Sequence, residues 1–173
     1  MTVARHVAAA VLALTLGVGT YLMLDGQTSR ESSREAAPSV AYTLLDGTPS
    51  SIDSLRGKVV LVNFWATSCA VCVREMLQIV ATHERFKARG FETLAVAMSH
   101  DAPASVVHFA QSQRLPFGVV IDNTGTVARS FGDVRLTPTT LLINKRGDIV
   151  KRVVGEPDFV ALDRLVEQLL AEI

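Results

Sequence analysis

Residues 58–75 read KVVLVNFWATSCAVCVRE and hold both cysteines of the 173-residue chain, Cys69 and Cys72. Residues 58–64 form a continuous apolar run rich in β-branched side chains, which is typical of a strand covered on both faces of a sheet. Over residues 69–88, apolar side chains recur at spacings of three and four, which indicates one buried face of a helix. The stretch therefore predicts a buried strand and then a helix that begins at the cysteine pair, with Thr67 or Ser68 as its cap.

Strands and helices continue to alternate over residues 39–173, which we take as one folded domain. Asp101 and Pro103 are expected to start the second helix. Expected strands cover residues 91–98, 118–121, 139–143 and 148–154, and expected helices cover residues 101–113 and the C-terminal end after Pro157. This order predicts an α/β sandwich around a mixed central sheet.

The composition is that of a globular domain with no polyanionic partner. Hydrophobic residues make up 49% of the chain and charged residues 20%, a balance typical of folded proteins. Lys and Arg together number 17, as do Asp and Glu, so the formal net charge is zero. Because nucleic-acid binders carry a clustered basic surface, we expect no nucleic-acid partner.

The N-terminus has a different character. Residues 7–24 contain no charged side chain, and a helix of this length spans about 27 Å, close to the apolar thickness of a bilayer. Residues 21–27 at the end of this run, YLMLDGQ, have large residues where a cleavage site would need A-x-A, which favours an uncleaved anchor over a signal peptide. We expect residues 1–24 to form a transmembrane anchor and residues 25–38 a flexible linker. Arg5 before the run places the domain in the periplasm or outside the cell.

Two thiols separated by two residues have several possible uses. Structural zinc needs four ligands, and the chain has neither a second C-x-x-C pair nor a suitably spaced histidine pair, so we expect no metal. A disulfide that closes so short a loop adds little stability to a fold, so a purely structural disulfide is not favoured. Two inert buried cysteines remain an alternative. A redox pair has a mechanism, because the free N–H groups and dipole of a helix N-terminus stabilise a thiolate. In that case Cys69 attacks a substrate disulfide and Cys72 then displaces the substrate.

The segment VVLVNFWATSCAVCVREM resembles the active site of thioredoxin-superfamily proteins, most closely the membrane-anchored, extracytoplasmic thiol–disulfide oxidoreductases of the TlpA/ResA type. The similarity extends over residues 39–173, through LLDGTPSSIDSLRGK and LPFGVVIDNTGTVARSFGDVRLTPTT. It implies a thioredoxin-like fold that needs no cofactor. It also implies that the protein reduces disulfides of protein substrates, apocytochromes c among them, with electrons from a membrane thiol donor.

The same resemblance assigns further site residues. Glu75 stands where the family often carries a buried glutamate, and it is expected to exchange protons with Cys72; an ordinary surface glutamate is the alternative. Thr137 and Pro138 stand in the family's cis-proline loop, which faces the cysteines and binds the substrate chain. Trp65 is expected either to contact the substrate or simply to pack beside the site.

Three positions differ from the family pattern. The family usually has Trp where this chain has Ser68, and often has Pro where this chain has Val71 and Leu77. The first two changes alter the surface and the reduction potential around Cys69, so they affect the choice of substrate. Two rival functions use the same thiols. One is a thiol peroxidase with Cys69 as its nucleophile, and the other is a copper-handling module without enzymatic activity, in which His100 joins the soft thiolates.

Overall fold

The computed structural model describes residues 35–172, and a six-stranded sheet in the order β1-β8-β7-β4-β5-β6 lies at its centre. The central strand β4 pairs in parallel with β5 and antiparallel with β7, so the sheet is mixed, as predicted. The strands of the sheet are β1 (Glu35–Ala36), β4 (Val59–Trp65), β5 (Phe91–Ala97), β6 (Gly118–Ile121), β7 (Thr139–Ile143) and β8 (Asp148–Val154).

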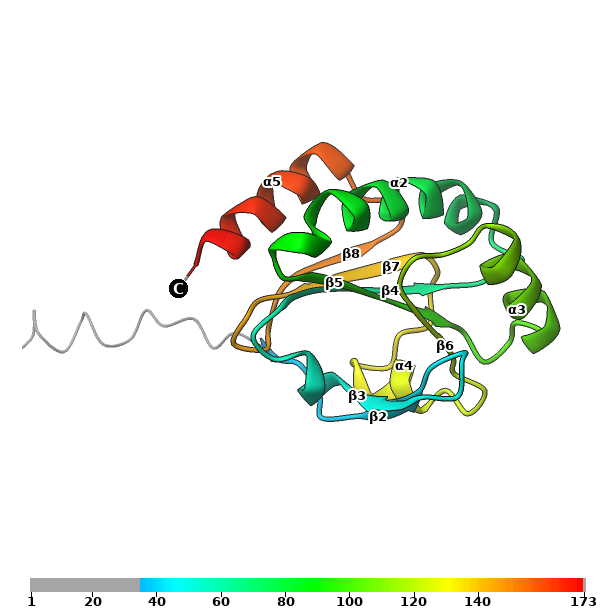
Figure 1. The fold of residues 1–173 in the computed structure, drawn as a ribbon. Helices are drawn as coiled ribbons and strands as arrows, with labels where there is room; N and C mark the ends of the chain where they lie inside the picture. The colour runs from blue at the N-terminus through cyan, green and yellow to red at the C-terminus, as the bar shows by residue number, and fades with distance from the viewer. Residues whose placement is uncertain (1–34, 173) are drawn as a thin grey trace, which may run out of the picture. The chain divides into compact units, whose positions relative to one another are not determined.

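The two faces of the sheet are covered by different elements (Figure 1). Helices α2 (Ala70–Phe86), α3 (Pro103–Ser112) and α5 (Phe159–Ala171) pack on one face, while α4 (Thr126–Ser130) and the hairpin of β2 (Ala41–Thr43) and β3 (Pro49–Ser51) lie on the other. Two short 3-10 helices, η1 (Ile52–Leu55) and η2 (Lys87–Arg89), precede β4 and follow α2. This arrangement confirms the thioredoxin-like α/β fold.

The seven residues of β4 explain why this strand lies in the centre. All of them are buried, and their side chains alternate between the two faces. Leu61 and Trp65 pack beneath the helices, whereas Val62 and Phe64 pack toward the hairpin and α4. Because each face of the strand faces its own apolar core, the continuous apolar run is what a doubly covered strand requires.

Most predicted elements are found within one or two residues of their expected bounds. Helix α2 begins at Ala70, one residue after the predicted start, and the short helix α4 was not expected. The expected C-terminal helix is α5, and its apolar stripe of Leu162, Val166, Leu169 and Leu170 is buried. Strand β1 pairs with β8 ahead of the expected domain start at Ser39.

The predicted anchor at residues 1–24 lies outside the described residues. Within residues 35–172, no helix combines the length and the apolar character that crossing a membrane would take.

A buried histidine should make stability depend on pH. His83 of α2 is 4% exposed, its Nδ1 lies 3.2 Å from the hydroxyl of Thr93, and Phe117 lies edge-on against its ring. Burial lowers the pKa of His83, with a smaller opposing effect from the charge of Glu92. Since the unfolded chain then takes up a proton more readily than the folded one, the contribution of His83 to stability should fall as the pH drops below about 6.5.

Urea unfolding at several pH values measures this effect. Relative to the parent, His83→Gln should gain free energy of unfolding as the pH falls below about 6.5, whereas His108→Gln, which changes an exposed histidine on α3, should keep the parent profile. An unchanged pH profile in His83→Gln would show that the histidine does not titrate on unfolding.

Candidate active site

The cysteine pair lies where β4 ends and α2 begins. Cys69 is the N-cap of α2, and its sulfur accepts a hydrogen bond from the main-chain N–H of Cys72 at 3.2 Å. The two sulfurs form a disulfide, with the Cα atoms 5.2 Å apart. The expectation that Thr67 or Ser68 caps the helix is therefore wrong. The hydroxyl of Thr67 instead donates to Asp101, which leaves Cys69 as the residue that caps the first turn.

The two sulfurs differ in how far solvent reaches them. Cys69 is half-buried and lies between the exposed residues Ser68 and Ala70, whereas Cys72 is 0% exposed. Since a thiol must be reachable to attack another protein's disulfide, this difference favours Cys69 as the attacking sulfur and Cys72 as the internal one.

Glu75 lies one turn after Cys72 on the same face of α2, and it is also 0% exposed. Its Oε1 accepts a hydrogen bond from Nδ2 of Asn63 at 2.9 Å, and its Oε2 has no hydrogen-bond partner among the described residues. Burial raises the pKa of Glu75 to about 7; the bond from Asn63 lowers it and the charge of Glu156 raises it by smaller amounts. The alternative of a surface carboxylate is therefore wrong, and Glu75 can change its protonation near neutral pH.

Sequence reasoning missed two polar residues of the sheet, Asn63, which donates to this carboxylate, and Thr140, which accepts a bond from Asn63. Asn63 of β4 stands opposite Thr140 of β7, and its Nδ2 also donates to the Thr140 hydroxyl at 3.1 Å. A signal for Asn63 is present in the sequence, because it is the single polar side chain in the buried strand VVLVNFW. Its partner could not be found in that way, since Thr140 lies 77 residues further along the chain.

Removing the amide of Asn63 should make Glu75 a weaker acid. Asn63→Leu eliminates the hydrogen bond that favours the carboxylate, so the pKa of Glu75 should rise above its parent value of about 7. Infrared titration of the carboxyl stretch measures this directly. The control Thr140→Val removes the other partner of Asn63 and should leave the titration close to that of the parent; equal midpoints in Asn63→Leu and the parent would contradict the assignment.

The predicted substrate loop lies at the same end of the sheet as the cysteines. Thr139, the first residue of β7, stands opposite Phe64, so Thr137 and Pro138 lie beside the loop that leads from β4 into Cys69. The Thr137–Pro138 bond is cis, as predicted. Among the described residues, the main-chain N–H and C=O of Thr137 have no hydrogen-bond partner, which leaves them available to an extended chain.

Trp65 does not have the surface that a substrate contact needs. Its side chain is 0% exposed and lies in the core beneath the helices, with its ring 5.1 Å from that of Phe109 on α3. The expected substrate contact is thus corrected in favour of packing, because the last side chain of β4 points into the core. Its indole N–H has no hydrogen-bond partner among the described residues.

Two other features of the described part do not extend the thiol site. His100 is exposed, and residues 35–172 contain no group of three or more His, Cys, Asp or Glu side chains that could hold a metal ion.

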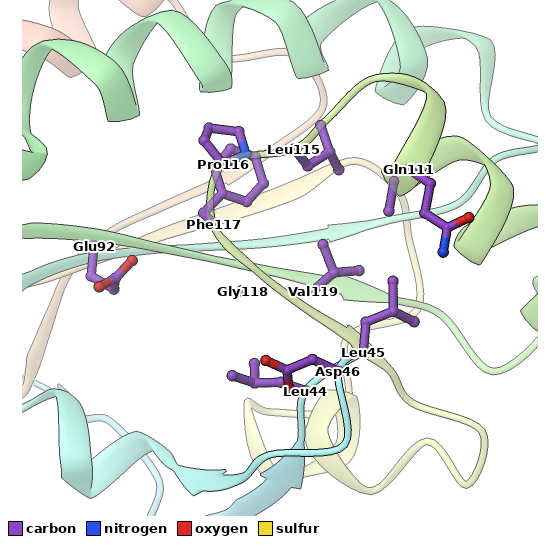
Figure 2. Close-up of a pocket in the computed structure, with 11 residues that line it drawn as sticks. Leu44, Leu45, Asp46, Glu92, Gln111, Leu115, Pro116, Phe117, Gly118 and Val119 are labelled. Atoms are coloured by element: carbon purple, nitrogen blue, oxygen red, sulfur yellow. The ribbon is translucent and has the colours of Figure 1, made fainter.

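An open cavity of about 510 Å³ lies between the hairpin loop, the segment after α3 and β6 (Figure 2). Glu92 and Gly118, at the beginnings of β5 and β6, line this cavity, whereas Cys69 follows the opposite end of the parallel strands.

Comparisons with known proteins agree with this site. The family model described as Redoxin matches residues 32–166. The chain is 34% identical to thiol–disulfide oxidoreductase ResA of Halalkalibacterium halodurans, over 84% of this chain and 82% of that protein.

Two solved structures share the fold. One is a proposed thioredoxin from Neisseria meningitidis, with a TM-score of 0.73 and 39% identity over 79% of this chain and 91% of that chain. The other is a proposed thiol:disulfide interchange protein DsbE from Chlorobium tepidum, with a TM-score of 0.73 and 26% identity over 80% of this chain and 97% of that chain. With the C-x-x-C pair at the start of α2 and the family model spanning the fold, the chain belongs to the Redoxin family and is a thiol–disulfide oxidoreductase of the TlpA/ResA type.

Proposed function

We propose that this thiol–disulfide oxidoreductase works outside the cytoplasm as a membrane-anchored reductant of protein disulfides, apocytochrome c among them, and receives its electrons from a membrane thiol donor. The observation that carries the proposal is the arrangement of a reachable Cys69, a buried Cys72 and a buried Glu75 with a pKa of about 7. The apolar residues 7–24, with Arg5 ahead of them, support the anchor and its direction.

The first step uses the more accessible sulfur, that of Cys69. In the reduced protein, the Cys69 thiolate attacks one sulfur of the substrate disulfide; the substrate S–S bond breaks, a Cys69–substrate bond forms, and the released thiolate takes a proton. The N-terminus of α2 supports the thiolate, because the N–H of Cys72 already donates to the Cys69 sulfur. The free main-chain groups of Thr137 hold the substrate chain in an extended form beside the cysteines.

The second step uses the buried sulfur. The thiol of Cys72 gives up its proton and attacks the sulfur of Cys69, which re-forms the Cys69–Cys72 disulfide and releases the second substrate thiol. Two electrons have then passed to the substrate, and the donor returns two to the protein. A buried thiol resists ionisation, so Glu75, which lies one turn away with a pKa near neutrality, accepts that proton.

Two measurements on the full chain test the proposal. A reporter that is active only in the cytoplasm, fused after Ile173, should be silent, whereas strong activity would contradict the topology. The reduced protein should convert an apocytochrome c peptide with an oxidised C-x-x-C-H motif to the dithiol, one peptide per protein. A Cys69→Ser, Cys72→Ser variant should leave the peptide oxidised. If the parent also leaves it oxidised while reducing other protein disulfides, the substrate assignment is wrong and the reductase activity stands.

A further inference from the structure

A buried carboxylate lies beside the loop that leads into Cys69, and neither exchange step above uses it. Asp101 is 7% exposed and accepts two hydrogen bonds from Thr67, one from the main-chain N–H at 2.5 Å and one from the hydroxyl at 2.6 Å. Within residues 35–172, Asp101 forms no ion pair with a basic side chain. A buried carboxylate is unfavourable unless hydrogen bonds replace those it made with water, so breaking either bond to Thr67 would cost free energy. The two bonds therefore hold the loop after β4 against the loop after β5.

The contact with Thr67 is one of two that fasten the reactive loop to the end of β5. The main-chain N–H of Met98 donates to the carbonyl of Trp65 at 3.0 Å, just before the loop. Within the loop, the N–H of Cys69 donates to the carbonyl of Ala66 at 3.1 Å, which closes a tight turn around Thr67. The position of Thr67 therefore determines where Cys69 emerges from the turn and where α2 begins.

We propose that Asp101 is a positioning residue for thiol–disulfide exchange by Cys69. By holding both the N–H and the hydroxyl of Thr67, its carboxylate fixes the turn from which the Cys69 sulfur approaches a substrate disulfide. Exchange needs the attacking sulfur in line with the S–S bond, and small displacements from a reactive geometry slow a reaction steeply. The carboxylate also adds a negative charge beside this loop. That charge disfavours a thiolate at Cys69 and so keeps the cysteine couple reducing.

A double-mutant cycle tests the contact. Asp101→Asn loses the charge and one of the two acceptor oxygens, and Thr67→Val loses the hydroxyl bond but keeps the shape of the side chain. Each variant should exchange with a small aromatic disulfide about tenfold more slowly than the parent. The double variant should be no slower than Asp101→Asn alone, because both changes break the same contact. Thr67→Ser keeps both donors and should restore the parent rate.

Asp122 provides a matched control. It is 4% exposed, follows β6 as Asp101 follows β5, and accepts main-chain bonds from Val127 and Ala128 of α4 instead of from the reactive loop. Asp122→Asn should keep the parent exchange rate. Parent rates in both Asp101→Asn and Thr67→Val, or equal losses in Asp101→Asn and Asp122→Asn, would overturn the proposal. If Asp101→Asn does not fold, the exchange rates of Thr67→Val and Thr67→Ser test the proposal without it.

The reduction potential of the Cys69–Cys72 couple distinguishes an effect of the Asp101 charge from a role limited to holding the loop, which would leave the potential unchanged. Equilibration with glutathione should show Asp101→Asn about tenfold easier to reduce than the parent, which corresponds to a potential about 30 mV less negative. Asp122→Asn should keep the parent potential. A potential in Asp101→Asn equal to or more negative than that of the parent would contradict the charge assignment.

Discussion

Cys72→Ser is expected to accumulate a covalent complex in which Cys69 is bound to its substrate, while turnover falls about a thousandfold or more. The half-buried Cys69 can still attack a substrate disulfide, but the buried sulfur that would displace the substrate is gone. Cys69→Ser should lose turnover to the same extent without forming the complex, because the remaining thiol is 0% exposed. Non-reducing electrophoresis and mass spectrometry of the trapped species measure both outcomes.

The exposed neighbour of the nucleophile offers the control for this pair. Ser68→Ala changes the residue next to Cys69 without removing a thiol, and it should turn over without trapping substrate. If Cys69→Ser forms the covalent complex and Cys72→Ser does not, the roles of the two cysteines are reversed.

Glu75→Gln should slow the release of substrate from the mixed disulfide by about a hundredfold at pH 7. The variant keeps the shape of the side chain but cannot take the proton of Cys72. The parent rate should change with pH around the pKa of Glu75, about 7, and this dependence should be absent in the variant. Stopped-flow measurement of single-turnover release from pH 5 to 9 would show both effects, because it isolates the second step.

The same variant makes a separate prediction for stability. In the disulfide form, the folded-state pKa of Glu75 is about 7, above the ordinary value of 4.5, so the folded protein holds this proton where the unfolded chain has lost it. The contribution of Glu75 to the free energy of unfolding should therefore fall by on the order of 3 kcal/mol as the pH rises from 4.5 to about 7, so the difference between the parent and Glu75→Gln should change by that amount over this range.

Glu84 provides the control for both measurements, since it is an exposed carboxylate on the same helix. Glu84→Gln should keep the release rate and the pH dependence of the parent. If Glu75→Gln gives the same pH–rate curve as the parent, Glu75 is a structural residue with no part in proton transfer.

The sequence was sufficient for features that depend on local pattern. The apolar run of β4, the cysteine spacing and the stripes of α2 and α5 each follow from periodicity, and the structure has these elements close to their expected bounds. Helix α4, with five residues, is too short to show such a pattern, so no helix was expected there.

Features that depend on distant partners could not be predicted. Asp101 has the sequence context of a helix cap, yet the cap of α3 is Ala102, and the carboxylate binds Thr67 of another loop 34 residues earlier. Trp65 follows an expected buried strand, but only the packed helices show that its ring has no exposed surface. The burial of Glu75 depends on how α2 packs against the sheet, where its carboxylate meets Asn63 of β4, so the sequence alone could not show it.

The reduction potential of the Cys69–Cys72 couple tests the central claim, that the protein is a reductant, most directly. Equilibrating the full chain with defined glutathione or dithiothreitol mixtures and counting free thiols by mass spectrometry gives the value. The proposed function predicts a potential in the range of thioredoxin, about −270 mV, at which the dithiol gives electrons to most protein disulfides. A value near that of a strong oxidant such as DsbA, about −120 mV, would contradict it, because the pair would then form disulfides in its substrates.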